Sequence, residues 1–246
     1  MVDGLRAHDR GPPSFDGIVA EHDAYVAALR SAGLAVTVLE PLEAMPDALF
    51  VEDPALVFSE GAILLRPGAP SRQAEAAAIA PTLRGLFETV IELPQGFADG
   101  GDVLVTPERV LIGRSARTDA AGAAALVQCL ARLGRQAEVV EPPAGVLHLK
   151  TACSLLDDET VLATPALART EMFGGLRQVI TPDGEDGAAN ALRINDGLLV
   201  SAGYPRTIDL LGSLGFTVVA LDTLEIAKLD AGLSCLSLRW LEPAAD

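Results

Sequence analysis

Residues 102–113, DVLVTPERVLIG, contain the pattern that decides the fold: an acidic residue, a short apolar run, a turn and a second apolar run. The turn at Thr106-Pro107-Glu108 predicts two strands that pair as a hairpin. A helix is expected next over residues 119–133, because Gly134 stands where helix ends favour glycine. Residues 137–140 form a further β-prone run, so the whole segment predicts one ββαβ unit with a polar residue at its head.

The same order of elements recurs along the chain, each time behind a polar residue. The heads are separated by 49, 46, 42 and 45 residues and are Asp53, Asp102, His148, Asn190 and Cys235. A period in this range indicates a propeller or an array, and the helix in each unit excludes a pure β-propeller. Five such units closed on themselves would place all five heads around one central channel. The sequence therefore predicts an α/β fold, a five-fold pseudosymmetric α/β propeller, as a single domain over residues 1–246.

The elements of the other units follow from the same pattern. Strands are expected at 54–58, 62–65 and 89–93 with a helix from about residue 71, at 149–156 and 160–163, and at 191–194, 198–200 and 216–219 with a helix from about residue 206. Cys235 begins a fifth strand near the end of the chain. The N-terminal part is expected to complete that unit with a helix at 16–31, Gly33 at its end and a strand at 35–39.

The composition limits the classes of protein to consider. Half of the 246 residues are apolar, so the chain can bury a sizeable core. The formal net charge of −16 argues against nucleic-acid binding, which needs a basic face. No apolar run reaches about 18 residues and no signal peptide is recognisable, so no membrane span is expected. Three widely spaced cysteines do not suggest a disulfide framework, and we expect reduced thiols in a cytoplasmic protein.

Three residue types point to covalent chemistry on a cation. Cys235 offers a thiolate nucleophile and His148 a general acid or base. Two acidic clusters would hold the positive charge: Asp47, Glu52 and Asp53, and Asp99 and Asp102. Taken alone, core packing is the default interpretation of Cys235 and of His148, and it is the interpretation we give to Cys129 and Cys153. No zinc-binding spacing and no nucleotide fingerprint is present in the sequence, so no metal and no cofactor is expected.

Six stretches spread over nearly the whole chain carry a resemblance to a known family. They are FVED at 50–53, DGGDVL at 99–104, SART at 115–118, LHLKT at 147–151, AGYPRT at 202–207 and DAGLSC at 230–235. In this order they resemble the pentein, or guanidine-modifying, superfamily, and within it most closely the dimethylarginine dimethylaminohydrolases. The resemblance implies a hydrolase that converts N-omega-methylated arginine to citrulline and methylamine or dimethylamine through a covalent intermediate on cysteine.

The resemblance also implies roles for the residues that carry the chemistry. Cys235 would be the nucleophile and His148 the general acid and base. Asp53 and Asp99 would hold the substrate guanidinium. Glu52 would support these residues beside His148.

The remaining matches concern substrate binding. They are Leu5, Asp47, Phe50, Arg72, Arg117 and Leu229. The two arginines match residues near the substrate α-carboxylate, and the two leucines match positions whose backbone carbonyls line the α-amino or reacting end. Asp47 matches a supporting acid, and Phe50 is expected at the substrate site.

Other activities stay open beside this interpretation. They are deimination of free arginine or another guanidine, amidinotransfer, and a non-enzymatic binding role for the same fold. The expected partner is a small guanidine substrate, with no nucleic acid and no membrane, and the protein is expected to be a monomer or homodimer. The chain begins at the loop that follows an N-terminal strand in relatives, so an unpaired strand edge is expected beside Cys235.

Overall fold

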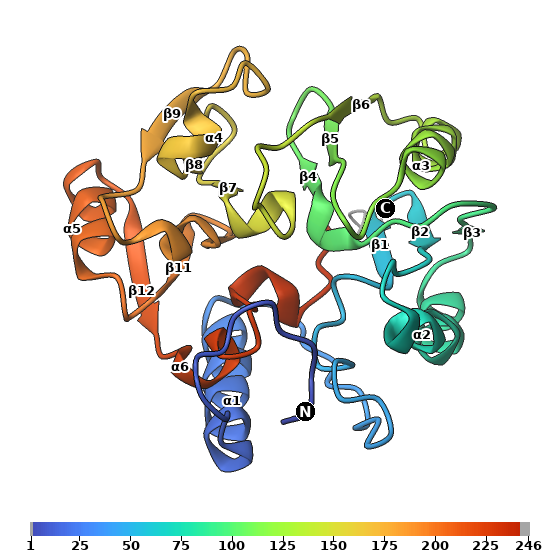
Figure 1. The fold of residues 1–246 in the computed structure, drawn as a ribbon, viewed down its shortest axis with the longest axis horizontal. Coiled ribbons are helices and arrows are strands. Elements are labelled where there is room, and N and C mark those ends of the chain that lie inside the picture. The colour runs from blue at the N-terminus through green and yellow to red at the C-terminus, as the bar shows by residue number, and fades with distance from the viewer. Residues whose placement is uncertain (1, 242–246) are drawn as a thin grey trace. The chain divides into compact units, whose positions relative to one another are not determined.

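The computed structural model describes residues 2–241, and their helices and strands are drawn in Figure 1. The chain forms two compact units. Unit 1 contains the residues up to Leu49 and Lys150–Leu236, and unit 2 contains Phe50–Leu149 and the segment from Ser237. The single domain over 1–246 stays a prediction, and each unit is described by itself.

Four three-stranded sheets of one topology lie in the described part of the chain, two in each unit. In every sheet the first two strands are antiparallel and the third runs parallel to the second. Unit 2 holds β1 (Ala55–Phe58), β2 (Gly61–Leu64), β3 (Val90–Glu92), β4 (Val103–Val105), β5 (Val110–Gly113) and β6 (Ala137–Val140). Unit 1 holds β7 (Cys153–Leu155), β8 (Thr160–Ala163), β9 (Arg177–Ile180), β10 (Leu192–Ile194), β11 (Gly197–Ser201) and β12 (Thr217–Leu221).

The crossovers of unit 2 are the helices α2 (Gln73–Leu86) and α3 (Ala120–Arg132), which connect the parallel strands of its two sheets. The Asp119 carboxylate accepts a hydrogen bond from the Gly122 amide at 2.6 Å and caps α3. Gly134 follows α3 with φ of +74°, a conformation that glycine adopts without strain. Strands β1, β2 and β5 are buried along their whole length, which explains their unbroken apolar sequences. The helix and strand predicted around Gly134 are therefore confirmed.

Unit 1 contains the long helix α1 (Phe15–Ser31) and three shorter ones, α4 (Pro165–Ala168), α5 (Pro205–Ser213) and α6 (Leu224–Ala227). Gly33 and Gly215 follow α1 and α5 with φ of +86° and +93°, as predicted for helix ends. Periodicity does not reveal α4, because a helix of four residues has a single turn. No helix of residues 2–241 is long and apolar enough to cross a membrane.

Short 3-10 helices stand at the heads of the repeat. Three of them, η2 (Gly100–Asp102), η3 (Leu149–Thr151) and η4 (Asp186–Ala189), each precede the first strand of a sheet. A fourth, η5 (Leu233–Leu236), contains Cys235, and a further one, η1 (Pro70–Arg72), leads into α2. The polar residues that begin the ββαβ repeats therefore lie in or beside tight turns, and where a sheet is formed they stand just before its first strand.

The two strands predicted for the fifth ββαβ repeat are not formed. Within residues 2–241, neither 35–39 nor the segment that begins at Cys235 belongs to a sheet, and the strand edge expected there is not formed either. The Cys235 amide donates to the Gly232 carbonyl at 3.2 Å, and the Ser234 amide donates to Asn190 Oδ1 at 3.0 Å. Amides engaged in a turn and a side-chain contact are not available to a β-ladder, so Cys235 lies in a 3-10 turn instead.

Candidate active site

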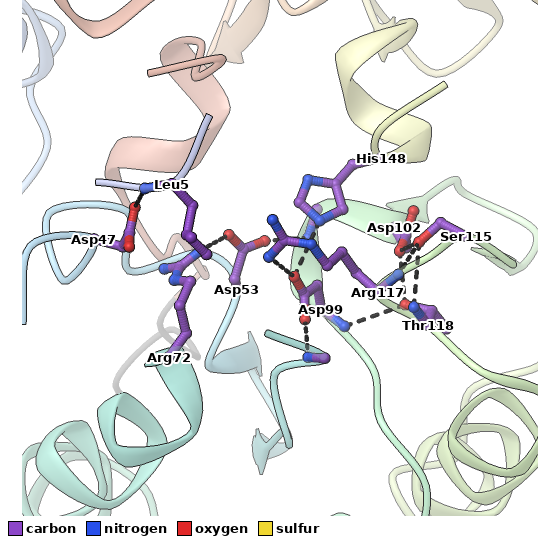
Figure 2. Close-up of polar contacts among 12 residues, drawn as sticks. Leu5, Asp47, Asp53, Arg72, Asp99, Asp102, Ser115, Arg117, Thr118 and His148 are labelled. Carbon is purple, nitrogen blue, oxygen red and sulfur yellow. Dashed lines mark hydrogen bonds and ion pairs between the residues drawn. The ribbon is translucent and has the colours of Figure 1, made fainter. Parts of the chain in front are cut away.

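Asp53 stands just before β1 and receives two kinds of donor in unit 2. Its Oδ1 accepts from the Gly101 amide at 2.9 Å, and its Oδ2 accepts from Arg72 Nη1 in a close ion pair, as Figure 2 shows. Burial by itself would raise the pKa of Asp53, but the charges of His148 and Arg72 and the Gly101 hydrogen bond outweigh it, so the pKa is lowered. Asp53 is therefore held as a carboxylate.

Arg72 joins Asp53 to the start of α2. Its guanidinium also donates to Glu75, from Nε at 3.0 Å and from Nη2 at 2.7 Å, and to the Phe50 carbonyl at 2.9 Å. Only 4% of Arg72 is exposed, and its carboxylate partners raise its pKa against the effect of burial. Glu75 was missed in the sequence; the signal was its position three residues after Arg72 at a helix start, where the two side chains share a face.

Asp99 is fully buried and lies against the imidazole. Its Oδ2 lies 3.1 Å from His148 Nε2 and 3.7 Å from Arg117 Nη1, and its Oδ1 accepts from the Gly68 amide at 2.7 Å (Figure 2). These contacts bring Asp99, His148 and Arg117 together in unit 2, and their roles toward a substrate stay predictions.

The two glycines of DGGD are required by close approach. A Cβ at Gly100 would lie 1.9 Å from the Glu52 carbonyl oxygen, which is too near for any side chain. A Cβ at Gly101 would lie 2.9 Å from both Asp53 Oδ1 and the His148 ring. The absence of side chains therefore lets the backbone of this turn pass directly beside the two functional groups.

His148 is surrounded by carboxylates. Burial lowers its pKa, but the charge of Asp53, the hydrogen bond with Asp99 and the charges of Asp102 and Asp99 outweigh burial and raise the pKa from 6.5 to about 9. The imidazole is therefore largely protonated at neutral pH and can donate a proton.

Three of these groups lie close to one another, two of them carboxylates that can accept from a cation. Ligand atoms of Asp53, Asp99 and His148 lie within 4.8 Å of one another. A metal ion requires a neutral imidazole, whereas the His148 pKa of about 9 favours the protonated form. The donor set thus suits an organic cation with N–H groups better than a metal ion, and the expectation of no metal stays a prediction.

Two further acids of unit 2 have other neighbours. Asp102 is fully buried and accepts hydrogen bonds from Ser115, Thr118 and the Leu149 amide. Glu52 is also buried, with its Oε1 3.7 Å from Arg239 Nη2. A supporting role for Glu52 beside His148 stays a prediction.

In unit 1, Cys235 is half-buried within η5. Asn190 braces the preceding residue, since its Oδ1 accepts from the Ser234 amide at 3.0 Å and its Nδ2 lies 3.2 Å from Ser234 Oγ. The same Nδ2 donates to the Lys150 carbonyl at 2.9 Å. The Asn190 side chain therefore connects the turn that carries Cys235 to Lys150, at the start of the third ββαβ repeat. This connection gives Asn190 a structural function.

The other predicted residues of unit 1 lie near the N-terminal segment. Asp47 Oδ1 accepts from the Leu5 amide at 2.8 Å, so Asp47 holds this segment by its backbone. Leu229 is buried, one residue before Asp230, whose carboxylate accepts from the Ala7 amide at 2.5 Å. The N-terminal segment is thus held at Leu5 by Asp47 and at Ala7 by Asp230, the residue after Leu229.

The two remaining cysteines are core residues, as predicted. Cys129 is buried in α3 and Cys153 in β7. Burial raises the pKa of both thiols, which keeps them protonated and unreactive.

The chain combines four ββαβ repeats with buried carboxylates and a histidine, and solved structures share this fold. The solved structure of dimethylarginine dimethylaminohydrolase from Pseudomonas aeruginosa superimposes with a TM-score of 0.93 at 36% identity, over 97% of this chain and 94% of that chain. The N-terminal domain of the cyanobacterial arginine dihydrolase ArgZ shares the fold, with a TM-score of 0.86 at 22% identity, over 97% of this chain and 92% of that chain. The predicted pentein fold is confirmed.

Sequence comparison gives the family. The arginine deiminase family model matches residues 41–185. Dimethylarginine dimethylaminohydrolases of Pseudomonas aeruginosa and Streptomyces coelicolor are each 36% identical over 98% of this chain, and the alignments cover 95% and 93% of those proteins. The chain belongs to the dimethylarginine dimethylaminohydrolase family.

Proposed function

We propose that the protein hydrolyses N-omega-methylated arginine to citrulline and methylamine or dimethylamine, with Cys235 as the covalent nucleophile. The observation that carries the proposal is the contact of the buried Asp99 with a largely protonated His148, next to the ionised Asp53. Carboxylates of this kind hold a guanidinium, and a protonated imidazole provides the acid for a departing amine.

Solved structures of dimethylarginine dimethylaminohydrolases support the assignment of nucleophile and acid/base. One, from Pseudomonas aeruginosa, has a cysteine-to-serine substitution and contains citrulline, and another has a histidine-to-glycine substitution and an adduct with S-methyl-L-thiocitrulline. The residue numbers of these two substitutions differ by 87, and Cys235 follows His148 at the same separation of 87 residues. The spacing supports Cys235 and His148 as the equivalent pair.

The first step is recognition of the guanidinium. In our proposal Asp53 and Asp99 accept hydrogen bonds from its nitrogens, which orients the planar cation toward the sulfur. Paired carboxylate–guanidinium contacts give both charge and geometry. Orientation of a reactant in this way can remove roughly 7–11 kcal/mol from an activation barrier.

The chemistry then follows in two half-reactions. The Cys235 thiolate attacks the guanidinium carbon, a C–S bond forms, and the C–N bond to the methylated nitrogen breaks as His148 gives that nitrogen its proton. The product of this half is an S-alkylthiouronium. Water next loses one proton to His148 and attacks the same carbon, the C–S bond breaks as the remaining hydroxyl proton passes to solvent, and the ureido group of citrulline and the thiolate are released.

The change of His148 from acid to base is a consequence of the charges around it. Its pKa of about 9 depends on Asp53, Asp99 and Asp102. A guanidinium bound between two of these carboxylates neutralises part of their field, so the His148 pKa falls when substrate binds. The imidazole therefore binds its proton before the first half-reaction and releases it more readily during catalysis.

The amino-acid end of the substrate is assigned to the residues that the sequence predicted. We place the α-carboxylate at Arg117, whose side chain is 20% exposed, and at Arg72, which would need to exchange one of its present partners. Backbone carbonyls at Leu5 and Leu229 would accept from the α-amino group. Phe50 and Asp47 complete the proposed binding residues, along with Glu52 as a supporting acid.

A second candidate is deimination of unmethylated arginine, which the arginine deiminase family model favours. Both reactions yield citrulline, so the test is a comparison of substrates. Purified protein is given asymmetric dimethylarginine, monomethylarginine, arginine or agmatine at equal concentrations, and the ureido product is measured colorimetrically. We expect the methylated arginines to have the highest kcat/KM, and Cys235→Ser to be the inactive control.

Other results would replace the proposal. Faster turnover of arginine than of either methylated substrate would make the protein a deiminase. No ureido product from any of the four would leave a binding role for the fold. The cytoplasmic location and the monomeric or homodimeric state are further proposals that rest on the sequence, and light scattering of the purified protein tests the second.

A further inference from the structure

We propose that Asp102 is a positioning residue that fixes three functional side chains in place without touching the substrate. They are His148, Arg117 and Asp99. The inference rests on the proposed function and adds a residue to it. Asp102 is fully buried at the end of η2, where no surface of its side chain is open to solvent.

The Asp102 carboxylate accepts three hydrogen bonds. Figure 2 shows its contacts with the Ser115 and Thr118 hydroxyls, which lie 2.6 and 2.7 Å from its Oδ2. Its Oδ1 accepts from the Leu149 amide at 3.0 Å. Each of the three donors in turn leads to one of the functional residues.

The Ser115 contact leads to Arg117. Ser115 Oγ already accepts from the Arg117 amide at 2.9 Å and from the Thr118 amide at 3.2 Å. A hydroxyl has two acceptor positions and one proton, so the proton of Ser115 is directed to Asp102. The carboxylate therefore holds the loop whose backbone carries Arg117.

The Thr118 contact leads to Asp99. Thr118 Oγ1 accepts from the Asp99 amide at 3.2 Å and donates to Asp102 at 2.7 Å. The third contact leads to His148, since the amide that binds Asp102 belongs to Leu149, the next residue. An amide at the first position of a short helix has no partner within that helix, and Asp102 supplies one at the start of η3.

All three contacts require Asp102 as an acceptor. Burial raises the pKa of Asp102, and the charge of His148 and the three hydrogen bonds only partly oppose this effect, so the pKa stays above its usual value. The charge of Asp102 acts on His148 in return and helps to raise the His148 pKa. Loss of this charge should therefore change both the geometry of the site and the proton affinity of the imidazole.

A carboxylate that only stabilises the fold would have different consequences. Its replacement would lower the melting temperature but leave the His148 pKa and the ratio of kcat to KM as they are. A positioning residue alters kcat, because misplacement of a reacting group by about 1 Å can cost about 10²-fold in rate. It alters KM less than kcat, because the charged contacts of Arg117 and Asp99 with the substrate tolerate a small displacement better than proton transfer by His148 does.

The test is Asp102→Asn, which keeps the size and removes the charge. We expect kcat for the methylated substrate to fall by about 10²-fold with KM changed less than about 3-fold. The His148 pKa, measured by NMR of the imidazole, should fall, and the basic limb of the kcat/KM profile should move to lower pH. The protein has three histidines, so a His148→Asn sample assigns the resonance.

A matched control is Glu185→Gln. Glu185 is likewise a buried acid that accepts from a hydroxyl and an amide, both of Thr207 in α5, at 2.7 Å. This variant should lose melting temperature while kcat and the His148 pKa stay at the wild-type values. If Asp102→Asn fails to fold, Thr118→Val and Thr118→Ser replace it. The valine variant lacks the hydroxyl that donates to Asp102 and should lose kcat, whereas the serine variant keeps that hydroxyl and should retain kcat.

The inference is overturned if folded Asp102→Asn keeps wild-type kcat and His148 pKa, or if Thr118→Val does so where Asp102→Asn is unfolded. The NMR readout separates this result from a failure of the proposed function. A wild-type protein that turns over none of the guanidines would refute the function, whereas the shift of the His148 pKa in Asp102→Asn would still show whether the carboxylate acts on the imidazole.

Discussion

His148 should make the stability of unit 2 depend on pH, in a direction that its surroundings determine. Burial lowers its pKa, but the charge of Asp53 and the contact with Asp99 outweigh burial and raise the pKa from 6.5 to about 9. A group with a raised pKa in the folded state stabilises the fold fully below its unfolded pKa, and this contribution is lost as the pH rises through the folded pKa. The window for His148 is therefore pH 6.5 to about 9.

The size of the effect follows from the same two values. A change of pKa from 6.5 to about 9 corresponds to about 3 kcal/mol of unfolding free energy. His148→Asn removes the titrating group and its contribution. The difference in unfolding free energy between wild type and His148→Asn should thus shrink by about 3 kcal/mol between pH 6 and pH 10.

The assay uses a probe that lies in the same unit. Trp240 is the single tryptophan and packs edge-on against Phe87, with ring centroids 4.9 Å apart. Its fluorescence during urea unfolding therefore reports on unit 2. Measuring both proteins at each pH cancels the titration of every other group.

His22→Asn is the control for this measurement. His22 lies in α1 of unit 1, and burial lowers its pKa, so its contribution has the opposite sign. The difference between wild type and His22→Asn, followed by far-UV circular dichroism because His22 lies outside unit 2, should not shrink as the pH rises. If wild type and His148→Asn lose stability in parallel from pH 6 to pH 10, His148 is not held protonated and the carboxylates do not act on it as described.

Three further outcomes concern catalysis. Cys235→Ser should keep below about 1% of wild-type kcat, because a serine hydroxyl is far less ionised than a thiol, whereas Cys129→Ser should keep most of it; substantial turnover by the first variant would exclude covalent catalysis. Asp99→Asn should lose roughly 2–5 kcal/mol in kcat/KM, as expected when one partner of a buried charge pair is neutralised, and an unchanged kcat/KM would place the guanidinium elsewhere. Arg117→Ala should raise KM for methylated arginine but not for agmatine, which lacks the α-carboxylate; equal effects on both substrates would contradict that assignment.

The fold could be predicted from the sequence wherever the strands of one ββαβ repeat form hydrogen bonds with each other. Strands such as β6 and β8 have the predicted bounds, because each continues an apolar run between clear turn signals. The segment at 35–39 has equally β-prone residues and is not part of a sheet. A strand is defined by its neighbour, and local composition does not contain that information.

The candidate site shows the same division between local and long-range information. The repeat placed Asp53 and His148 at the heads of two repeats, the family resemblance added Asp99, and in unit 2 ligand atoms of all three lie within 4.8 Å of one another. The position of Glu75 three residues after Arg72 indicates that the two side chains can pair, but the individual hydrogen bonds of Arg72 were not predictable, since they depend on rotamers and burial. Chemical type and repeat period identify the members of such a site, while packing decides which donor faces which acceptor.

The partners of Asp53 bear on how a substrate guanidinium can bind there. Arg72 is itself a guanidinium that donates to Asp53, and Glu75 holds the same arginine from its other side. A substrate that takes the place of Arg72 on Asp53 exchanges one guanidinium for another, so the carboxylate keeps its charge partner throughout. Arg72 keeps Glu75 and is not left as an uncompensated buried charge, a state that costs about 3–5 kcal/mol. Asp53 is therefore held in its ionised form, and in the proposed function it would favour a guanidinium, the kind of cation whose hydrogen-bonding geometry Arg72 already satisfies.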